Sequence, residues 1–221
     1  MRKLKVCYVV CTNRPQFAEW YQWNYDKQSY RADQRELIVV DGCDDLADAR
    51  TQGVLRCDGD VIAFADDDDW EHPHRLEILA SLYNPMFEVV GSQNGYFVDI
   101  ETGRFICAHR TGGPHFNGAM YSLEIARQTL PVQWGGRDDA GNVIKEAEDV
   151  YFMVQCEMRA KGVGMIRFPL HFWGCHTYNM CNKSGRHDFG GQESILPQLE
   201  PVDPDLPAQL ELLRQRLRRA A

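Results

Sequence analysis

The sequence predicts an α/β protein in which helices flank a central, mostly parallel sheet. Apolar runs at residues 4–11, 36–42 and 61–65 are nearly continuous, as strands buried on both faces of a sheet would be. A turn and helix at residues 12–23 and a helix and turn at residues 46–60 separate these runs. This alternation of strand and helix is typical of a doubly wound sheet.

In the first half of the chain, each predicted helix has one apolar side. Pro15 suits the first turn of the first helix, and the residues that fall on one side of that helix are Phe17, Trp20, Tyr21 and Asn24. The helix at residues 72–83 follows the third strand, and its apolar residues are Leu76, Leu79, Ala80 and Tyr83. The two histidines in that segment, His72 and His74, are assigned to the helix start.

The second half changes character. Alternation around residues 101–103 predicts a hairpin, and residues 115–128 predict a strand that leads into a short helix. A helix is expected from Glu148 to Lys161, closed by Gly162, followed by one last strand at residues 165–173.

The domain organisation predicted is one domain at residues 1–196, then a proline-rich linker and an amphipathic helix at residues 197–221. That helix could dock a partner or form an oligomer. Packing on its own domain is the commoner situation, and we prefer it.

Composition places the chain among soluble globular proteins. It has 221 residues, of which 44% are hydrophobic and 25% charged, and a net charge of −8 that disfavours a general affinity for nucleic acid or anionic membranes. Eight scattered cysteines without a CxxC pair favour a reducing compartment, so we expect a cytoplasmic location. The N-terminal segment is interpreted as the first strand, not as a signal peptide, and no apolar stretch approaches membrane-spanning length.

Acidic residues gather where predicted strands end. Asp66 to Asp69 follow the third strand and Asp41 ends the second, and ligands of such sheets bind at the carboxyl ends of strands. A solvated turn would explain one or two aspartates better than four in a row. Carboxylates are preferred ligands of Mg²⁺ and Mn²⁺, which commonly accompany phosphate groups.

Two further motifs are weak evidence of function when each is taken alone. Glu148 and Asp149 open a helix, where acidic residues also complement the helix dipole; the functional interpretation makes Asp149 a general base. His171 and His176 flank Trp173 at the end of the last strand, and Cys175 and Cys181 nearby leave a zinc site as a minor alternative, although the spacing matches no zinc pattern.

Taken in order, these segments resemble the family 2 glycosyltransferases of the GT-A fold, a Rossmann-like single domain. The matching pieces run from about residue 4 to residue 182 and are VVCTNRP, LIVVDGCDD, ADARTQG, GDVIAFADDDDWEHPHRLE, FNGAMYSLEIA, AEDVYFMVQCEMRAKG and FWGCHTYN. The resemblance implies a nucleotide-diphosphate sugar donor, most often a UDP-sugar, and Mn²⁺ or Mg²⁺ as cofactor.

The resemblance also implies roles for individual residues. Donor-binding residues would be Thr12, Arg14, Pro15, Asp41, Arg50, Asp66 and Asp67. Within that set, Asp41 would contact the base and Asp66 would lie near the ribose. Asp68 would be the metal-binding aspartate of the DxD motif, with Asp67 and Asp69 in support and the register ambiguous by one.

For the reaction, the resemblance implies an inverting transfer. Asp149 matches the catalytic base, with Glu148 beside it, and His176 matches a histidine that approaches the metal or the diphosphate. Asp149 would take the proton of the attacking hydroxyl while the metal offsets charge on the leaving group.

Other functions stay open. A nucleotidyltransferase would need a glycine-rich, basic loop after the first strand, whereas CTNRPQ has one arginine and no glycine. A non-catalytic nucleotide-sugar-binding module is the third hypothesis. The acceptor could be a glycan, a lipid, a protein or a hydroxylated base in DNA. The basic tail RQRLRR would suit DNA, but a solvated helix face explains it equally simply.

Overall fold

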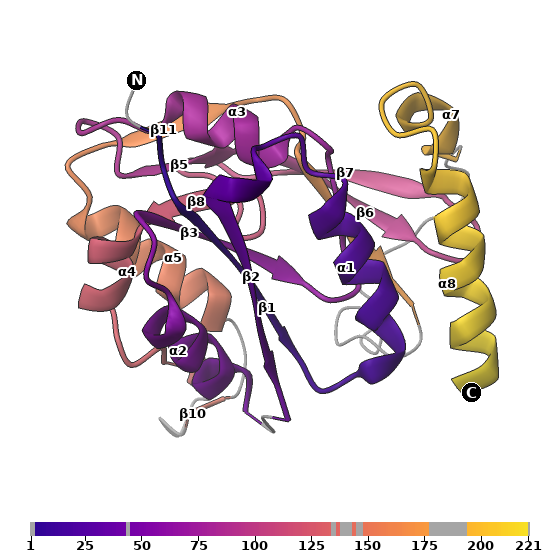
Figure 1. Cartoon of the computed structure of the whole chain (residues 1–221), viewed down its shortest axis with the longest axis horizontal. Helices are drawn as coiled ribbons and strands as arrows, with labels where there is room; N and C mark the ends of the chain where they lie inside the picture. The colour runs from indigo at the N-terminus through magenta and orange to yellow at the C-terminus, as the bar shows by residue number, and fades with distance from the viewer. Residues whose placement is uncertain are drawn as a thin grey trace.

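A six-stranded sheet forms the centre of the protein, with the strand order β11-β5-β8-β3-β1-β2 (Figure 1). The computed structural model describes residues 3–42, 45–133, 136–137, 143–144, 148–176 and 194–220. The strands of this sheet are β1 (Val6–Thr12), β2 (Arg35–Asp41), β3 (Val61–Asp66), β5 (Val89–Ser92), β8 (Ala119–Ser122) and β11 (Val163–Ile166). β1 runs parallel to β2 and β3, β11 runs parallel to β5, and β8 runs antiparallel to both of its neighbours.

Helices cover both faces of this sheet. On one face lie α2 (Leu46–Arg56), α4 (Leu123–Gln128) and α5 (Glu148–Arg159), which stand together in Figure 1. On the other lie α1 (Ala18–Asp26), which follows a 3₁₀ turn at Pro15–Phe17, and α3 (Arg75–Leu82). Successive side chains of a strand point to opposite faces, so the apolar run of β1 supplies alternate residues to each of two core clusters.

A smaller sheet lies beside the central one, with the order β4-β12-β6-β7. Its strands are β4 (Trp70–Glu71), β12 (His171–Cys175), β6 (Asn94–Asp99) and β7 (Phe105–His109). The turn between β6 and β7 places Gly103 at φ +73°, a conformation that glycine adopts without a steric cost. A two-stranded ladder joins β9 (Gly136–Arg137) to β10 (Val143–Ile144).

The C-terminal helices pack on the protein itself. α7 (Leu196–Leu199) and α8 (Leu206–Ala220) belong to a third apolar cluster, together with Phe17 and Trp20 and with Val98 of β6. Four leucines of α8, spaced three or four residues apart, line the buried side of that helix: Leu206, Leu210, Leu213 and Leu217. In Figure 1, α8 runs along one side of the molecule, next to β6 and β7. The domain boundary expected at residue 197 stays a prediction.

Most of the predicted elements are present, but the last predicted strand is wrong. Residues 165–173 form the end of β11 in the central sheet and the start of β12 in the smaller sheet, with an irregular segment between them. Pro169 lies in that segment and has no backbone N–H for a ladder. Side chains fix the bend, because Ser92 Oγ donates to the Phe168 carbonyl at 2.6 Å. The sequence-based prediction also missed β4 and β5.

Several sequence features lie outside the described residues: Cys43, Cys181, residues 177–193 and most of residues 134–147. Among the described cysteines, Cys107 is exposed and the others are buried. Within the described part of the chain, no helix combines the length and apolar character needed to cross a bilayer.

Candidate active site

The four aspartates form a tight turn at the carboxyl end of the central sheet. β3 ends at Asp66, and the chain reverses over the next residues before Trp70 enters β4. The exposed fractions are 2%, 6% and 3% for Asp67, Asp68 and Asp69. A solvated turn is therefore wrong as an explanation, because three of the four carboxylates are buried and need specific partners.

Asp67 is held by the loop that follows β1. The Thr12 hydroxyl donates to Asp67 Oδ2, and Arg14 binds both oxygens of that carboxylate through Nε and Nη2. Burial, together with the neighbouring charge of Asp68, raises the pKa of Asp67 to about 6, even though Arg14 and Thr12 stabilise the anion. The structure therefore brings together three of the predicted donor-site residues, namely Thr12, Arg14 and Asp67.

Asp68 lies between Arg14 and His176. Its Oδ2 is 2.9 Å from His176 Nε2 and 2.9 Å from Arg14 Nη2. Burial opposes ionisation of Asp68, but the hydrogen bond with His176 and the charge of Arg14 outweigh it, so the pKa lies below its ordinary value. His176 follows β12 and is buried, with its ring 5.4 Å from that of Phe17.

Asp69 anchors the turn to the rest of the protein. Its carboxylate accepts a hydrogen bond from the backbone N–H of Gly174 on β12 at 3.1 Å. Its backbone carbonyl accepts from Trp20 Nε1 at 2.7 Å and from Asn24 Nδ2 at 3.0 Å, both on α1. Burial raises the pKa of Asp69 well above its ordinary value. This residue therefore ties the acidic turn to the strand that leads to His176.

Asn117 is a site residue that the sequence-based reasoning did not single out. Its side-chain amide donates to Asp66 Oδ2 and to Asp69 Oδ2, each at 2.8 Å. One amide group thus holds two like-charged side chains in place, and its own Oδ1 is buried without a hydrogen-bond partner among the described residues. The segment FNGAMYSLEIA contains it, but nothing in that segment distinguishes Asn117 from an ordinary loop residue before a strand.

Arg50 connects α2 to the start of α5. This buried guanidinium lies 3.0 Å from Glu148 Oε1 and 3.3 Å from Asp66 Oδ1, and it stacks 4.2 Å from the ring centre of Phe116. Burial raises the pKa of Glu148, and the charge of Arg50 acts in the opposite direction. α2 begins at an Asp45 cap whose carboxylate accepts from two backbone N–H groups, and this fixes the helix that carries Arg50.

Asp149 follows Glu148 in the first turn of α5. It is half-buried, and its Oδ1 accepts from the Val150 backbone N–H at 2.8 Å. Asp41 and Pro15 are both exposed, and Asp41 lies opposite Thr12 in the parallel pairing of β2 with β1. The geometry places these residues at the same sheet end as the acidic turn.

The donor set fits a hard divalent cation. Mg²⁺ binds oxygen ligands at about 2.1 Å in octahedral geometry, so two neighbouring ligand atoms stand about 3.0 Å apart. Asp68 Oδ2 and His176 Nε2 are 2.9 Å apart in a hydrogen bond, and two neighbouring ligands of one cation would have a similar separation. The low pKa of Asp68 keeps its carboxylate in the ionised form that a metal ligand requires. A carboxylate with one imidazole also suits Mn²⁺.

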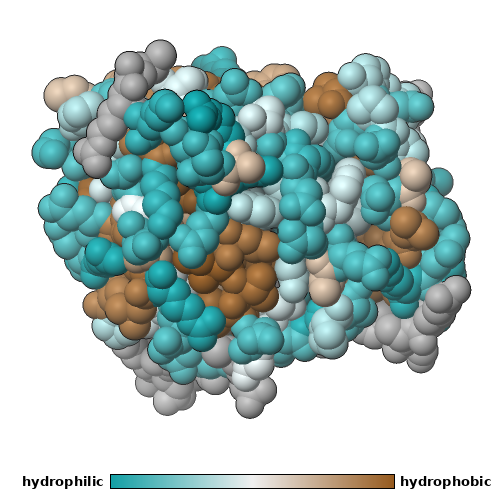
Figure 2. Space-filling model, viewed as in Figure 1, coloured by the Kyte–Doolittle hydropathy of each residue, from teal (hydrophilic) through white to brown (hydrophobic). Residues whose placement is uncertain are grey.

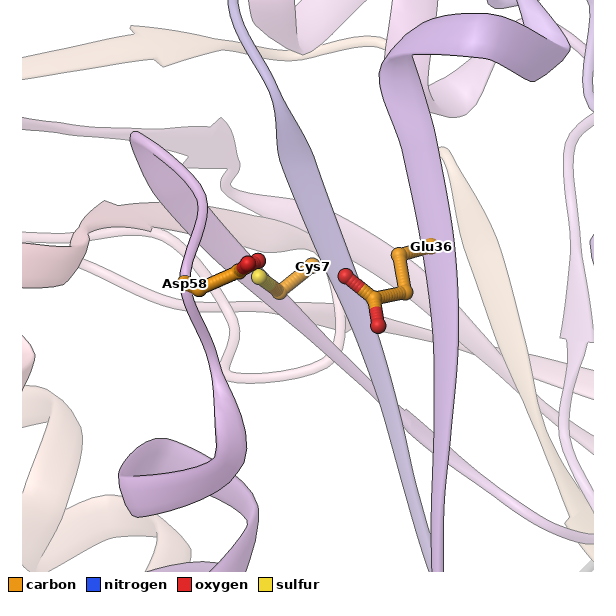
Figure 3. A group of neighbouring side chains, drawn as sticks. All are labelled: Cys7, Glu36 and Asp58. Atoms are coloured by element: carbon orange, nitrogen blue, oxygen red, sulfur yellow. The ribbon is translucent and has the colours of Figure 1, made fainter.

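A second group of metal-ligand atoms lies away from this site. Cys7, Glu36 and Asp58 have ligand atoms within 4.8 Å of one another, and Figure 3 shows both carboxylates directed toward the thiol. Lys5 already supplies a cation there, because its ammonium lies 3.2 Å from Glu36 Oε2 and also contacts Asp58. These residues belong to the beginnings of β1 and β2 and to the segment before β3. They therefore form an ion-pair cluster at the opposite sheet end.

Comparisons with known proteins agree with this geometry. Residues 28–106 match the profile of "Glycosyl transferase family 2". TarS from S. aureus, residues 1–349 in complex with UDP-GlcNAc, superimposes with a TM-score of 0.59 at 13% identity, covering 96% of this chain and 71% of that one. The mannosyltransferase PcManGT from Pyrobaculum calidifontis, in complex with GDP-Man and Mn²⁺, superimposes with a TM-score of 0.58 at 14% identity. That match covers 100% of this chain and 76% of the PcManGT chain.

This chain spans only part of the length of the TarS structures that it matches. In another comparison, with TarS residues 1–349 alone, the match covers 77% of this chain and 60% of that one. Against a further TarS structure, it covers 43% of the TarS chain. A search of curated proteins found no significant match. The predicted GT-A fold is confirmed, and the resemblance to family 2 glycosyltransferases is confirmed over residues 28–106.

Proposed function

We propose that this chain, a GT-A protein with the sequence pattern of glycosyltransferase family 2, moves a sugar from a nucleotide-diphosphate donor to an acceptor hydroxyl. The transfer is metal-dependent and inverting, and the preferred donor is a UDP-sugar. One observation carries the proposal. Side chains from four separate segments, namely Thr12 and Arg14, the acidic turn, the start of α5, and His176, converge at one end of the sheet.

The donor side has the charges that a diphosphate and a cation require. Asp68 and His176 are the residues that would hold Mn²⁺ or Mg²⁺, and the cation would offset negative charge on the departing nucleotide diphosphate. Arg14 already contacts Asp67 and Asp68, so a bound cation adds to the positive charge there. The anionic diphosphate compensates that excess. Metal and donor should therefore bind cooperatively.

The acceptor side centres on Asp149. Its carboxylate takes the proton of the attacking hydroxyl while that oxygen forms the new bond to the anomeric carbon from the face opposite the leaving group. Arg50 and Glu148 fix the first turn of α5 from which Asp149 projects.

Asp149→Asn tests the base assignment. The amide keeps the size of the side chain but cannot accept a proton, so transfer should fall by about 10² to 10⁴ while donor binding persists. Release of nucleotide diphosphate is measured with a panel of donors, with glycan, lipid-linked, protein and hydroxylated-DNA acceptors. Near-normal turnover of Asp149→Asn would refute the assignment.

Asp68→Ala tests the metal assignment without relying on turnover. Binding of Mn²⁺ followed by electron paramagnetic resonance should be lost in Asp68→Ala and in His176→Ala, and should persist in Asp58→Ala, a matched aspartate change in the ion-pair cluster. Normal Mn²⁺ binding by Asp68→Ala would move the metal site elsewhere. Pyrophosphate release from a nucleoside triphosphate would favour a nucleotidyltransferase, and donor binding without any turnover would favour a binding module.

We propose a reducing, cytoplasmic compartment, because the eight cysteines are scattered along the chain without a CxxC pair.

A further inference from the structure

One long side of β2 has no strand partner among the described residues. β2 is the last strand of the six-stranded sheet, and it pairs with β1 over all seven of its residues. The other side of an edge strand presents backbone N–H and C=O groups that can pair with a further strand. An unpaired strand of this length is therefore a candidate interaction surface.

The surface over this strand is apolar. Figure 2, drawn from the same side as Figure 1, shows hydrophobic side chains gathered over β1 and β2 between α1 and α2. Leu37 and Val39 of β2 are half-buried, and Leu55 on the adjacent α2 is 56% exposed. Contiguous apolar surface beside an open edge is typical of protein contact sites.

The sequence of β2 complements itself when it runs antiparallel to a second copy. With the two-fold axis at Ile38, Leu37 lies opposite Val39 and Arg35 lies opposite Asp41. All four residues are on the same face of the strand, because side chains alternate with a period of two. One face of the pair would thus carry two apolar contacts and two contacts between opposite charges.

Neither charged end, Arg35 or Asp41, has an ion-pair partner among the described residues. The Arg35 guanidinium donates to the backbone carbonyls of Tyr25 and Asp26 and packs over the Tyr25 ring, so a contact with a second copy would share or replace these bonds. Asp41 is exposed. A shift of the register by one residue would lose both charge pairs, so the charges specify a single alignment.

We propose that β2 is a dimerisation edge, on which a second copy of this chain docks antiparallel around Ile38 to form a continuous sheet across a two-fold axis. The inference rests on the edge strand and not on the glycosyltransferase proposal, although it uses Asp41, which is also the residue expected to contact the base of the donor. The competing view is that two side chains shield the edge and keep the chain monomeric. Arg56 donates to the Val39 carbonyl at 3.2 Å, and the Tyr25 hydroxyl donates to the Arg35 carbonyl at 3.1 Å.

A charge exchange tests the alignment. Sedimentation equilibrium of the whole chain should show the mass rising with concentration from 25.4 kDa to twice that value. Arg35→Asp and Asp41→Arg should each weaken the dimer at least tenfold, because each puts like charges opposite one another twice. The double variant Arg35→Asp/Asp41→Arg should restore affinity to within about threefold, and this rescue would not follow from a folding defect.

Controls distinguish the two edges of the sheet. Leu37→Lys should abolish the dimer, whereas Met165→Lys, on the exposed edge strand β11 at the other end of the sheet, should leave it unchanged. Circular dichroism confirms that each variant is folded. A monomer at every concentration, failure of the double variant to recover, or a dimer lost in Met165→Lys and kept in Leu37→Lys would each overturn the proposal.

Discussion

The buried pair of Arg50 and Glu148 gives the most direct test of how the site is built. Arg50→Met keeps an unbranched side chain of similar length but removes the only cation beside Glu148 among the described residues. Breaking a buried ion pair by removing one partner typically costs about 3–5 kcal/mol. Asp66 also loses its contact with Arg50 at 3.3 Å. Its side chain is about one-third exposed and keeps the hydrogen bond from Asn117, so this contact contributes little to the loss of stability.

Protonation of Glu148 limits this cost. Its ordinary pKa is 4.5, so at pH 7 taking up a proton costs at most 2.5 pKa units, or about 3.4 kcal/mol. At pH 5 the same limit falls to about 0.7 kcal/mol. In the variant, the pKa of Glu148 in the folded state rises further above the unfolded value. The added loss of stability is therefore absent below pH 4.5 and grows as the pH rises.

The assay is urea unfolding of the wild type and Arg50→Met at pH 5 and pH 7. We expect the difference in free energy of unfolding to be about 3 kcal/mol at pH 7 and to shrink by at least half at pH 5. The double variant Arg50→Met/Glu148→Gln should recover most of the stability without recovering activity, because neutral residues need no counter-ion. An equal loss at both pH values, or no recovery in the double variant, would refute the reasoning.

Three further outcomes are expected. Asn117→Ala removes hydrogen bonds to two carboxylates and should lower the free energy of unfolding by about 2–4 kcal/mol, whereas Asn117→Asp, which adds a third carboxylate, should be worse; equal losses in urea titrations would contradict this. Burial lowers the pKa of His115 to about 4, so its stabilising effect is present above pH 6.5 and should fall by about 2 kcal/mol between pH 7 and pH 5, a loss that His115→Gln should not show. Glu36→Gln should leave the Mn²⁺ dependence of donor binding unchanged in calorimetry, since Lys5 already neutralises that cluster; a changed dependence would implicate it as a metal site.

The sequence predicted the elements whose signal is local. Three apolar strands, the amphipathic helices and the hairpin at residues 101–103 appear where periodicity and turn chemistry indicate them. The sequence-based prediction was wrong at residues 165–173, where one apolar segment contributes a strand to each of two sheets. Local periodicity does not show where a strand changes its partner, and strand pairing is decided by contacts far apart in the chain.

The candidate site likewise has features that the sequence predicts and features that it does not. The sequence alone determined that four aspartates follow a buried strand and that Thr12, Arg14 and the acidic start of α5 lie at strand or helix ends. The order of these motifs was sufficient to indicate the GT-A fold and the resemblance to family 2 glycosyltransferases.

Only the tertiary structure decided which residues meet. Asp68 and His176 are 108 residues apart in the sequence, and Asp69 and Asn117 are 48 residues apart. Neither contact can therefore be predicted from a local sequence pattern. The structure also divided the four aspartates, with Asp69 anchored to β12 and Asp68 directed to His176. Burial is the physical reason, because buried carboxylates must find donors, and donors come from whichever segments the fold places beside them.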